Sequence, residues 1–188
     1  MKTQSIPRQL LSLALMWSLL ATVTISLTNC TGTDVIMEGL TVARDVVKVA
    51  QVSAGLDPQV SSLLTKVSGD LDIVIKTYAD YEAAAPGDKP SKAVLVRATI
   101  TAINANLGDI LTAVGVKDPK IRVLVAVVNT ALVAVMDHIV SKATTPAGIT
   151  VTRPATPELP VIAGAKSAKD LKKAWNDAVA GNSALQLK

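Results

Sequence analysis

The sequence predicts an all-α protein: an up-and-down four-helix bundle made of two helical hairpins, followed by a short C-terminal amphipathic helix. One observation is the spacing of apolar residues, which recur at steps of three and four over long stretches. Another is a pair of Asp-Pro dipeptides, at 57–58 and 118–119, each of which follows a glycine and precedes an apolar run. The composition adds that 49% of residues are hydrophobic while Phe is absent, so the core must consist mainly of Val, Leu, Ile and Ala.

The N-terminal segment, residues 1–29, has the layout of a secretory signal peptide. Lys2 and Arg8 make the first residues positively charged, with no acidic residue among them, and the apolar run from Leu10 to Leu27 carries no charge. The run is nearly as long as the roughly 20 apolar residues that span a bilayer. A cleaved signal and a retained membrane anchor therefore both fit this segment. The third alternative is a buried N-terminal helix of a soluble protein, but a helix that is apolar all round suits a membrane better than a surface.

Cys30 is the single cysteine of the chain, and it directly follows Leu27, Thr28 and Asn29. This stretch resembles the lipobox of bacterial lipoproteins, in which leucine is favoured three places before the cysteine. In that family the thiol receives a diacylglycerol, the chain is cut just before the cysteine, and the new N-terminus is acylated again. The resemblance covers residues 1–30 only, and Asn29 stands where the family usually has Gly, Ala or Ser.

The resemblance implies that Cys30 is a lipidation site carrying acyl chains such as palmitate, and that membrane lipid is the first partner of the protein. Thr31 follows the cysteine, whereas an Asp there commonly retains such proteins in the inner membrane. The resemblance therefore implies an outer-membrane anchor, with the rest of the chain facing the periplasm. A free thiol that follows an ordinary signal is the alternative, and a chain with one cysteine forms no internal disulfide.

Residues 30–143 are predicted to form the helical bundle. Gly55 and Gly115 suit the left-handed position that ends a helix. Each Asp-Pro pair suits the start of the next helix, with the carboxylate as N-cap and the proline at the first helical position. The apolar residues after the two pairs match at an offset of 61 positions, which favours an internal repeat of two hairpins. The expected helices are 34–54, 58–85, 91–114 and 119–143.

Two features of these stretches leave alternatives open. Val-rich runs such as "IRVLVAVV" also fit strands, although the periodicity and the caps favour helices. The last helix has an apolar run from Val123 to Met136 that is interrupted only by Asn129 and Thr130. We interpret it as the central helix of the bundle, with a membrane-inserting hairpin as the alternative.

The C-terminal part divides into a Pro-rich linker at 144–167 and an amphipathic helix at 168–181. The prolines forbid a continuous helix in the linker, which is expected to be extended or to strap over the bundle. Ser167 and Asp170 resemble a capping box, and Gly181 is expected to end the helix. A basic amphipathic helix of this kind suits a membrane surface, a partner protein, or the bundle itself. The candidate contact residues are Leu171, Lys172, Lys173, Trp175 and Val179.

Few groups in the chain suit catalysis or metal binding. His138 is the only histidine, and its neighbour Asp137 points about 100° away on a helix, so a Ser-His-Asp relay is disfavoured. A zinc site needs three or four suitable ligands. We therefore expect a structural His138, no enzymatic activity, no metal and no cofactor. Asn104, Asn106 and Asn129 interrupt apolar stretches, and some of them are expected to be buried and hydrogen-bonded between helices.

The charge balance excludes a strongly basic nucleic-acid-binding protein. Two of the 19 Lys and Arg lie in residues 1–29, so the rest of the chain has 17 against 15 Asp and Glu, a net charge of +2. The sequence thus predicts a lipid-anchored cell-envelope protein with a non-catalytic structural or interaction role, and with an envelope protein as a second candidate partner. The alternatives are a module that holds an apolar ligand inside the bundle and a membrane-anchored protein whose N-terminal helix is not cleaved.

Overall fold

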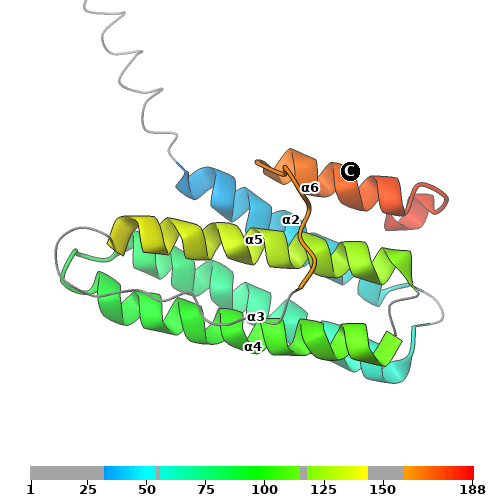
Figure 1. The fold of residues 1–188 in the computed structure, drawn as a ribbon, viewed down its shortest axis with the longest axis horizontal. Helices are drawn as coiled ribbons and strands as arrows, with labels where there is room; N and C mark the ends of the chain where they lie inside the picture. The colour runs from blue at the N-terminus through cyan, green and yellow to red at the C-terminus, as the bar shows by residue number, and fades with distance from the viewer. Residues whose placement is uncertain (1–31, 54–55, 115–117, 144–158) are drawn as a thin grey trace, which may run out of the picture. The chain divides into compact units, whose positions relative to one another are not determined.

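The computed structural model describes residues 32–53, 56–114, 118–143 and 159–188. The chain separates into two compact units, residues 1–34 and 35–188, and the fold described below is that of the second. The long helices are α2 (Thr33–Gln51), α3 (Pro58–Ala83), α4 (Lys89–Val114) and α5 (Pro119–Ala143). A shorter helix, α6 (Ala168–Ala178), and a single 3-10 turn, η1 (Ser183–Leu185), follow them (Figure 1).

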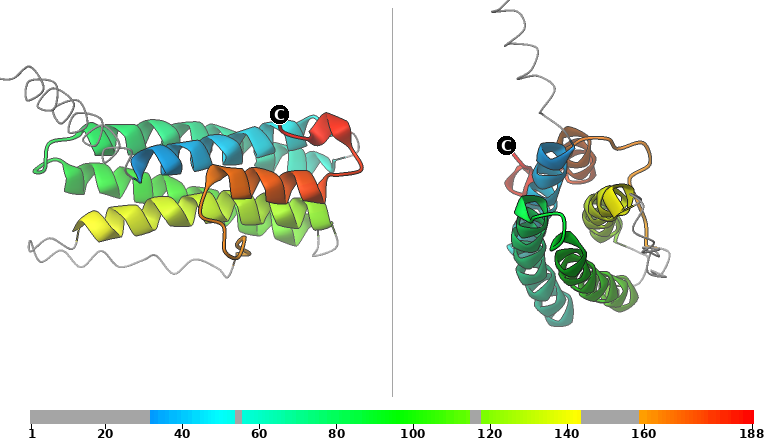
Figure 2. Two further views of the ribbon diagram at one scale, coloured as in Figure 1. Left: turned by 90° about the horizontal axis from the view of Figure 1, so that it is seen from above. Right: turned by 90° about the vertical axis from the view of Figure 1, so that its left-hand side faces the viewer.

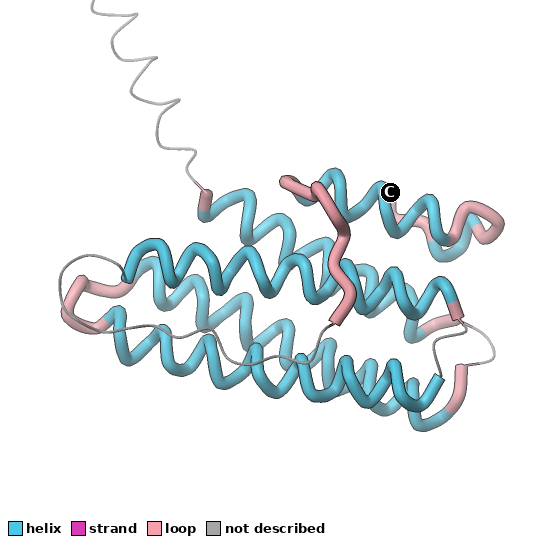
Figure 3. The backbone as a smooth tube through the Cα atoms, viewed as in Figure 1, coloured by secondary structure: helices cyan, strands magenta, loops and turns pink. Residues whose placement is uncertain are grey.

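The four long helices form the predicted bundle. Successive helices run in opposite directions, and the end-on view shows α2, α3, α4 and α5 side by side around a common centre (Figures 1 and 2). Within the described residues the chain has helices and loops and no strand (Figure 3). The Val-rich run at 121–128 is therefore helical, as the periodicity predicted, and lies in α5.

Local sequence explains where α3 and α5 begin. Asp57 Oδ1 accepts a hydrogen bond from the backbone N–H two residues further on at 2.7 Å, and Asp118 Oδ1 does the same at 2.8 Å. Pro58 and Pro119 are the first helical residues, where a missing N–H costs nothing. Both predicted N-caps are confirmed.

The helix boundaries differ slightly from the prediction. α2 ends at Gln51, three residues early, and the N–H of Ser53 donates to Ala50 O at 3.0 Å. α4 begins at Lys89 rather than at 91, and α3 ends at Ala83 rather than at 85. The helix-ending role predicted for the glycines at 55 and 115 falls outside the described residues.

One apolar core fills the space between the helices. The stripes that match at an offset of 61 both face this core, which is consistent with the predicted repeat. Valine, leucine and isoleucine supply most of the buried volume, with Tyr78 and Trp175 as its largest fully buried side chains. The buried members of the two stripes are Val60, Leu63, Leu64, Val67, Leu71 and Val74 in α3, and Ile121, Leu124, Val125, Val128, Leu132, Val135 and Met136 in α5.

Helix α5 is the most enclosed of the long helices. Every residue from Leu124 to Asn129 is buried, because α5 packs against α4, α6 and residues 159–162 as well as the bundle interior. By length and composition alone, α5 over 119–142 and α4 over 89–113 could each cross a membrane. Most of that stretch of α5 is buried inside the fold, as in the central helix of a soluble bundle.

The described segment before α6, residues 159–167, crosses α5 and leads into α6 (Figures 1 and 2). A tight turn redirects it, in which the N–H of Ala165 donates to Ile162 O at 3.3 Å and Gly164 has a φ of 76°. Glycine adopts this left-handed conformation without steric cost. The prediction that Gly181 ends the last helix is wrong, because α6 already ends at Ala178 and a short turn follows before η1.

Candidate functional site

The lipobox-like residues 27–30 and the predicted signal peptide 1–29 lie outside the described residues. The nearest described element is α2, which begins at Thr33, three positions after Cys30. Folded helix therefore starts almost immediately after the candidate lipidation site. Residues 144–158 of the Pro-rich linker also lie outside the described residues.

The apolar side of α6 packs on the bundle and is not available at the surface. Leu171, Trp175 and Val179 are 4%, 1% and 2% exposed. The surface that these three residues were expected to offer to a membrane or a partner is therefore inside the fold in this structure. Lys172 is half-buried and Lys173 is exposed, so the cationic part of the candidate surface remains at or near solvent.

The predicted capping box fixes the start of α6. Ser167 Oγ accepts a hydrogen bond from the N–H of Asp170 at 3.3 Å, and Asp170 Oδ2 accepts from the N–H of Ser167 at 3.0 Å. The N–H of Lys166 also donates to Asp170 Oδ2, at 2.9 Å. The bond from the Lys166 backbone, followed by the Ser167 hydroxyl, holds the pKa of the Asp170 carboxyl below its usual value.

The chain after α6 folds back and closes over it. The indole N–H of Trp175 donates to Leu185 O at 2.8 Å, inside the core. The Asn176 amide donates to Leu187 O at 3.0 Å and accepts from the N–H of Leu187 at 2.8 Å. The Lys172 ammonium contacts the backbone oxygen of Lys188. α6, η1 and the last residues therefore behave as one docked C-terminal segment.

Two polar residues of α5 bind the non-helical stretch before α6, residues 159–162. The Asn129 side chain donates to both Leu159 O and Pro160 O at 3.1 Å. Thr130 Oγ1 accepts from the N–H of Ile162 at 2.8 Å. This part of the linker is thus a strap over the bundle, one of the two forms expected for it.

The three asparagines singled out in the sequence have different environments. Asn129 is buried as expected, but it bonds to the strap rather than to another helix. Asn106 links α4 to α3, through a bond of 3.3 Å from its amide to Asp70 Oδ2. Asn104 is 4% exposed, and its side-chain oxygen has no hydrogen-bond partner within the described residues.

His138 belongs to a small cluster at the end of the bundle where α3 and α5 finish. Its Nε2 lies 3.0 Å from Glu82 Oε1, and its ring packs edge-on against Tyr78 with centroids 6.0 Å apart. Tyr81 stacks on Tyr78 at 6.2 Å, and the Lys89 ammonium lies 4.9 Å from the centroid of the Tyr81 ring. Burial, followed by the negative charge of Glu82, raises the pKa of Tyr81.

These contacts agree with a structural role for His138, since its ring is engaged with α3. Sequence reasoning missed the pairing with Glu82, which lies 56 positions away in the chain. Among the described residues no group of three or more His, Cys, Asp or Glu has the geometry to hold a metal ion.

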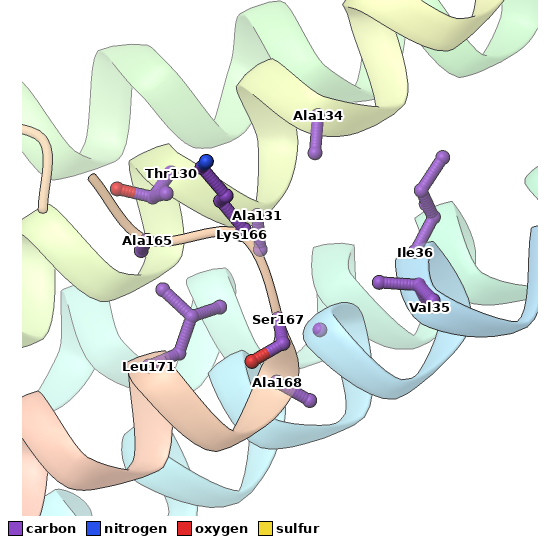
Figure 4. A pocket seen from close by; sticks show the side chains of 11 residues that line it. Val35, Ile36, Thr130, Ala131, Ala134, Ala165, Lys166, Ser167, Ala168 and Leu171 are labelled. Carbon is purple, nitrogen blue, oxygen red and sulfur yellow. The ribbon is translucent and has the colours of Figure 1, made fainter. Parts of the chain in front are cut away.

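A groove of about 200 Å³ lies between α2, α5 and the start of α6 (Figure 4). Most of its lining is apolar, and its one charged side chain is Lys166. The lining residues are Val35, Ile36, Gly39, Thr130, Ala131, Ala134, Ala165, Lys166, Ser167, Ala168 and Leu171. Local sequence patterns do not indicate this groove, because it is formed by three segments far apart in the chain.

The comparisons with known proteins found no match among protein-family models, curated proteins or solved structures.

Proposed function

We propose that this protein is a lipid-anchored component of a bacterial cell envelope with a non-catalytic structural or interaction role. The observation that carries the proposal is the stretch Leu27-Thr28-Asn29-Cys30, placed directly after a basic head and an uncharged apolar run. In the proposed protein Cys30 carries the lipid, residues 1–29 are removed, and the helical bundle faces the periplasm from the outer membrane. Two acyl attachments give stable anchoring, where a single chain binds a membrane only marginally.

The fold supports an anchored scaffold in two ways. Helix α2 begins at Thr33, so the bundle is joined to the proposed anchor by a very short connection. The described part also buries one continuous apolar core that includes α6, which suits a rigid body presenting its surface to other molecules. The His138 ring takes part in this packing through Glu82 and Tyr78.

The alternative of an apolar ligand enclosed by the bundle gains little support. The core side chains of all four long helices interlock with exposures near zero. The groove of about 200 Å³ lies at the edge of the bundle and is smaller than the roughly 300–1,000 Å³ of pockets that enclose drug-sized ligands.

Metabolic labelling tests the proposal. Cells expressing the wild type, Cys30→Ser and the matched control Thr31→Ser are grown with radiolabelled palmitate. We expect label in the wild type and in Thr31→Ser, and none in Cys30→Ser. Label at equal intensity in Cys30→Ser, or in none of the three proteins, would overturn the assignment of Cys30.

Membrane fractionation tests the location. The wild type is expected in outer-membrane fractions, and Thr31→Asp is expected to shift toward the inner membrane. A wild type found entirely in the inner membrane would contradict the proposed destination. An unlabelled protein that stays in membranes would instead identify residues 10–27 as an uncleaved anchor.

A further inference from the structure

Helix α6 covers only part of the seam between α2 and α5. It has 11 residues and a length of about 16 Å, whereas the 19 residues of α2 extend over about 28 Å. α6 passes α2 beside Gly39, where an added Cβ would lie 3.8 Å from Leu171 Cδ1. Among the described residues, no helix covers the seam between this point and the start of α2, and the groove described above opens there (Figure 4).

Small side chains create the hollow, and larger apolar ones form its walls. Gly39, Ala131 and Ala134 leave space between the helices, while Val35 and Leu171 border it. Val35, which lines the groove, is 43% exposed. The groove therefore presents apolar surface that nothing in the described part of the chain covers.

The two hydroxyl groups in the lining are already used by the fold. Thr130 Oγ1 donates to Ala126 O at 2.7 Å and accepts from the N–H of Ile162. Ser167 Oγ donates to Asp170 Oδ2 at 2.9 Å. A ligand in the groove would therefore contact mainly apolar side chains and one charged side chain.

That charge is Lys166, which lies at the edge of the groove beside Thr130 (Figure 4). The side chain is exposed, and within the described ranges its ammonium forms no ion pair. An apolar hollow with a single cation at its rim is complementary to an amphiphile that has an apolar chain and an anionic head.

We propose that this groove holds one acyl chain of an anionic phospholipid, with the phosphate beside Lys166. A volume of about 200 Å³ exceeds the roughly 150 Å³ of an apolar cavity that binds benzene. It is too small for a whole lipid, so the groove takes a segment of one chain and leaves the remainder in the bilayer.

The source of the phospholipid is the membrane that carries the protein, and this step rests on the proposed function. Val35 follows Cys30 by five positions, and five extended residues reach at most about 18 Å. Lipidation of Cys30 would therefore hold this wall of the groove close to the bilayer surface, where phospholipid is the most abundant amphiphile.

The test uses the full chain purified from membranes in a mild detergent. Native mass spectrometry counts phospholipids that remain bound without a covalent bond, and denaturing mass spectrometry counts covalent acyl groups. The blocking variant is Ala134→Phe, which fills the groove from an exposed position. The matched control is Ala102→Phe, at an exposed position of α4 outside the groove.

We expect one bound phospholipid for the wild type and for Ala102→Phe. We expect about tenfold less for Ala134→Phe, the change produced by losing contact with roughly two methylene groups. A second variant, Val35→Gln, should lower retention without filling the groove. Lys166→Gln should reduce the share of anionic lipids among those retained.

Equal retention in the wild type and in both Ala134→Phe and Val35→Gln would overturn the groove assignment, as would a wild type that retains no phospholipid. Circular dichroism of each variant checks that the helices are intact. The denaturing spectrum separates the two proposals: a missing covalent acyl mass contradicts lipidation of Cys30, whereas its presence with no bound phospholipid contradicts only the groove.

Discussion

Replacement of Trp175 by alanine tests whether the C-terminal segment is part of the cooperative fold. The side chain is 1% exposed, and its indole N–H donates to Leu185 O at 2.8 Å. A buried aromatic side chain of this size removes about 150–250 Å² from water, worth about 4–6 kcal/mol at 25 cal/mol per Å². Alanine keeps a small part of that burial, so we expect Trp175→Ala to lower the free energy of unfolding by about 3–5 kcal/mol.

The more conservative variant separates packing from hydrogen bonding. Trp175→Phe keeps most of the apolar contact but leaves Leu185 O without its donor, so a loss of about 1–2 kcal/mol is expected. Lys173→Ala, on the exposed side of the same helix, serves as the matched control and should change stability by no more than about 0.5 kcal/mol.

The assay is urea unfolding of the purified protein followed by circular dichroism, which reports on all helices together. A single transition whose midpoint falls in Trp175→Ala is the expected result. If the global unfolding free energy of Trp175→Ala lies within about 0.5 kcal/mol of the wild type, α6 detaches independently of the bundle. That result would refute the conclusion that the C-terminal segment shares one core with α2–α5.

Three further predictions follow from other contacts. A double-mutant cycle of Glu82→Ala and His138→Ala should give a coupling energy of about 1–2 kcal/mol in urea unfolding, and additive effects would mean that the contact at 3.0 Å does not stabilise the fold. The pKa of Asp170 is below 3.8 in the folded protein, so its contribution to folding stability is complete above that pH and is lost as the pH falls through the folded pKa. The unfolding free energy measured against pH should therefore show an acid step that Asp170→Asn lacks. Identical acid profiles of the two proteins would contradict the capping role. The pKa of Tyr81 is above 10.0 in the folded protein, so its contribution to folding stability is present below pH 10.0 and is lost as the pH rises toward the folded pKa. The loss of unfolding free energy in alkaline solution should therefore be smaller in Tyr81→Phe than in the wild type. The same alkaline loss in both proteins would argue against burial of the hydroxyl.

The parts of the fold that the sequence predicted are those set by local chemistry. Asp57 and Asp118 cap their helices through bonds to amides two residues away, so the dipeptides alone located both helix starts. The capping box at Ser167 and Asp170 is equally local. Apolar periodicity over α3 and α5 then identified the core-facing stripes of these two helices.

The features of the fold that could not be predicted are contacts between segments that are far apart in the sequence. The stripe of Leu171, Trp175 and Val179 suits a membrane, a partner or the bundle equally well, because each of these buries apolar side chains. Only the three-dimensional structure shows that it packs on α5 and beside Gly39. The pairing of His138 with Glu82 and the bonds from Asn129 to the strap join residues that local sequence patterns do not connect.

The proposed function depends on Cys30 carrying the lipid that anchors this protein. The most direct measurement is the denatured intact mass of the protein purified from membranes, for the wild type and for Cys30→Ala. We expect the wild type to lack residues 1–29 and to gain a mass equal to a diacylglycerol and a further acyl chain, and we expect Cys30→Ala to lack this gain. An unmodified mass in both proteins, whether of the full chain or of a chain cut elsewhere, would contradict lipidation of Cys30.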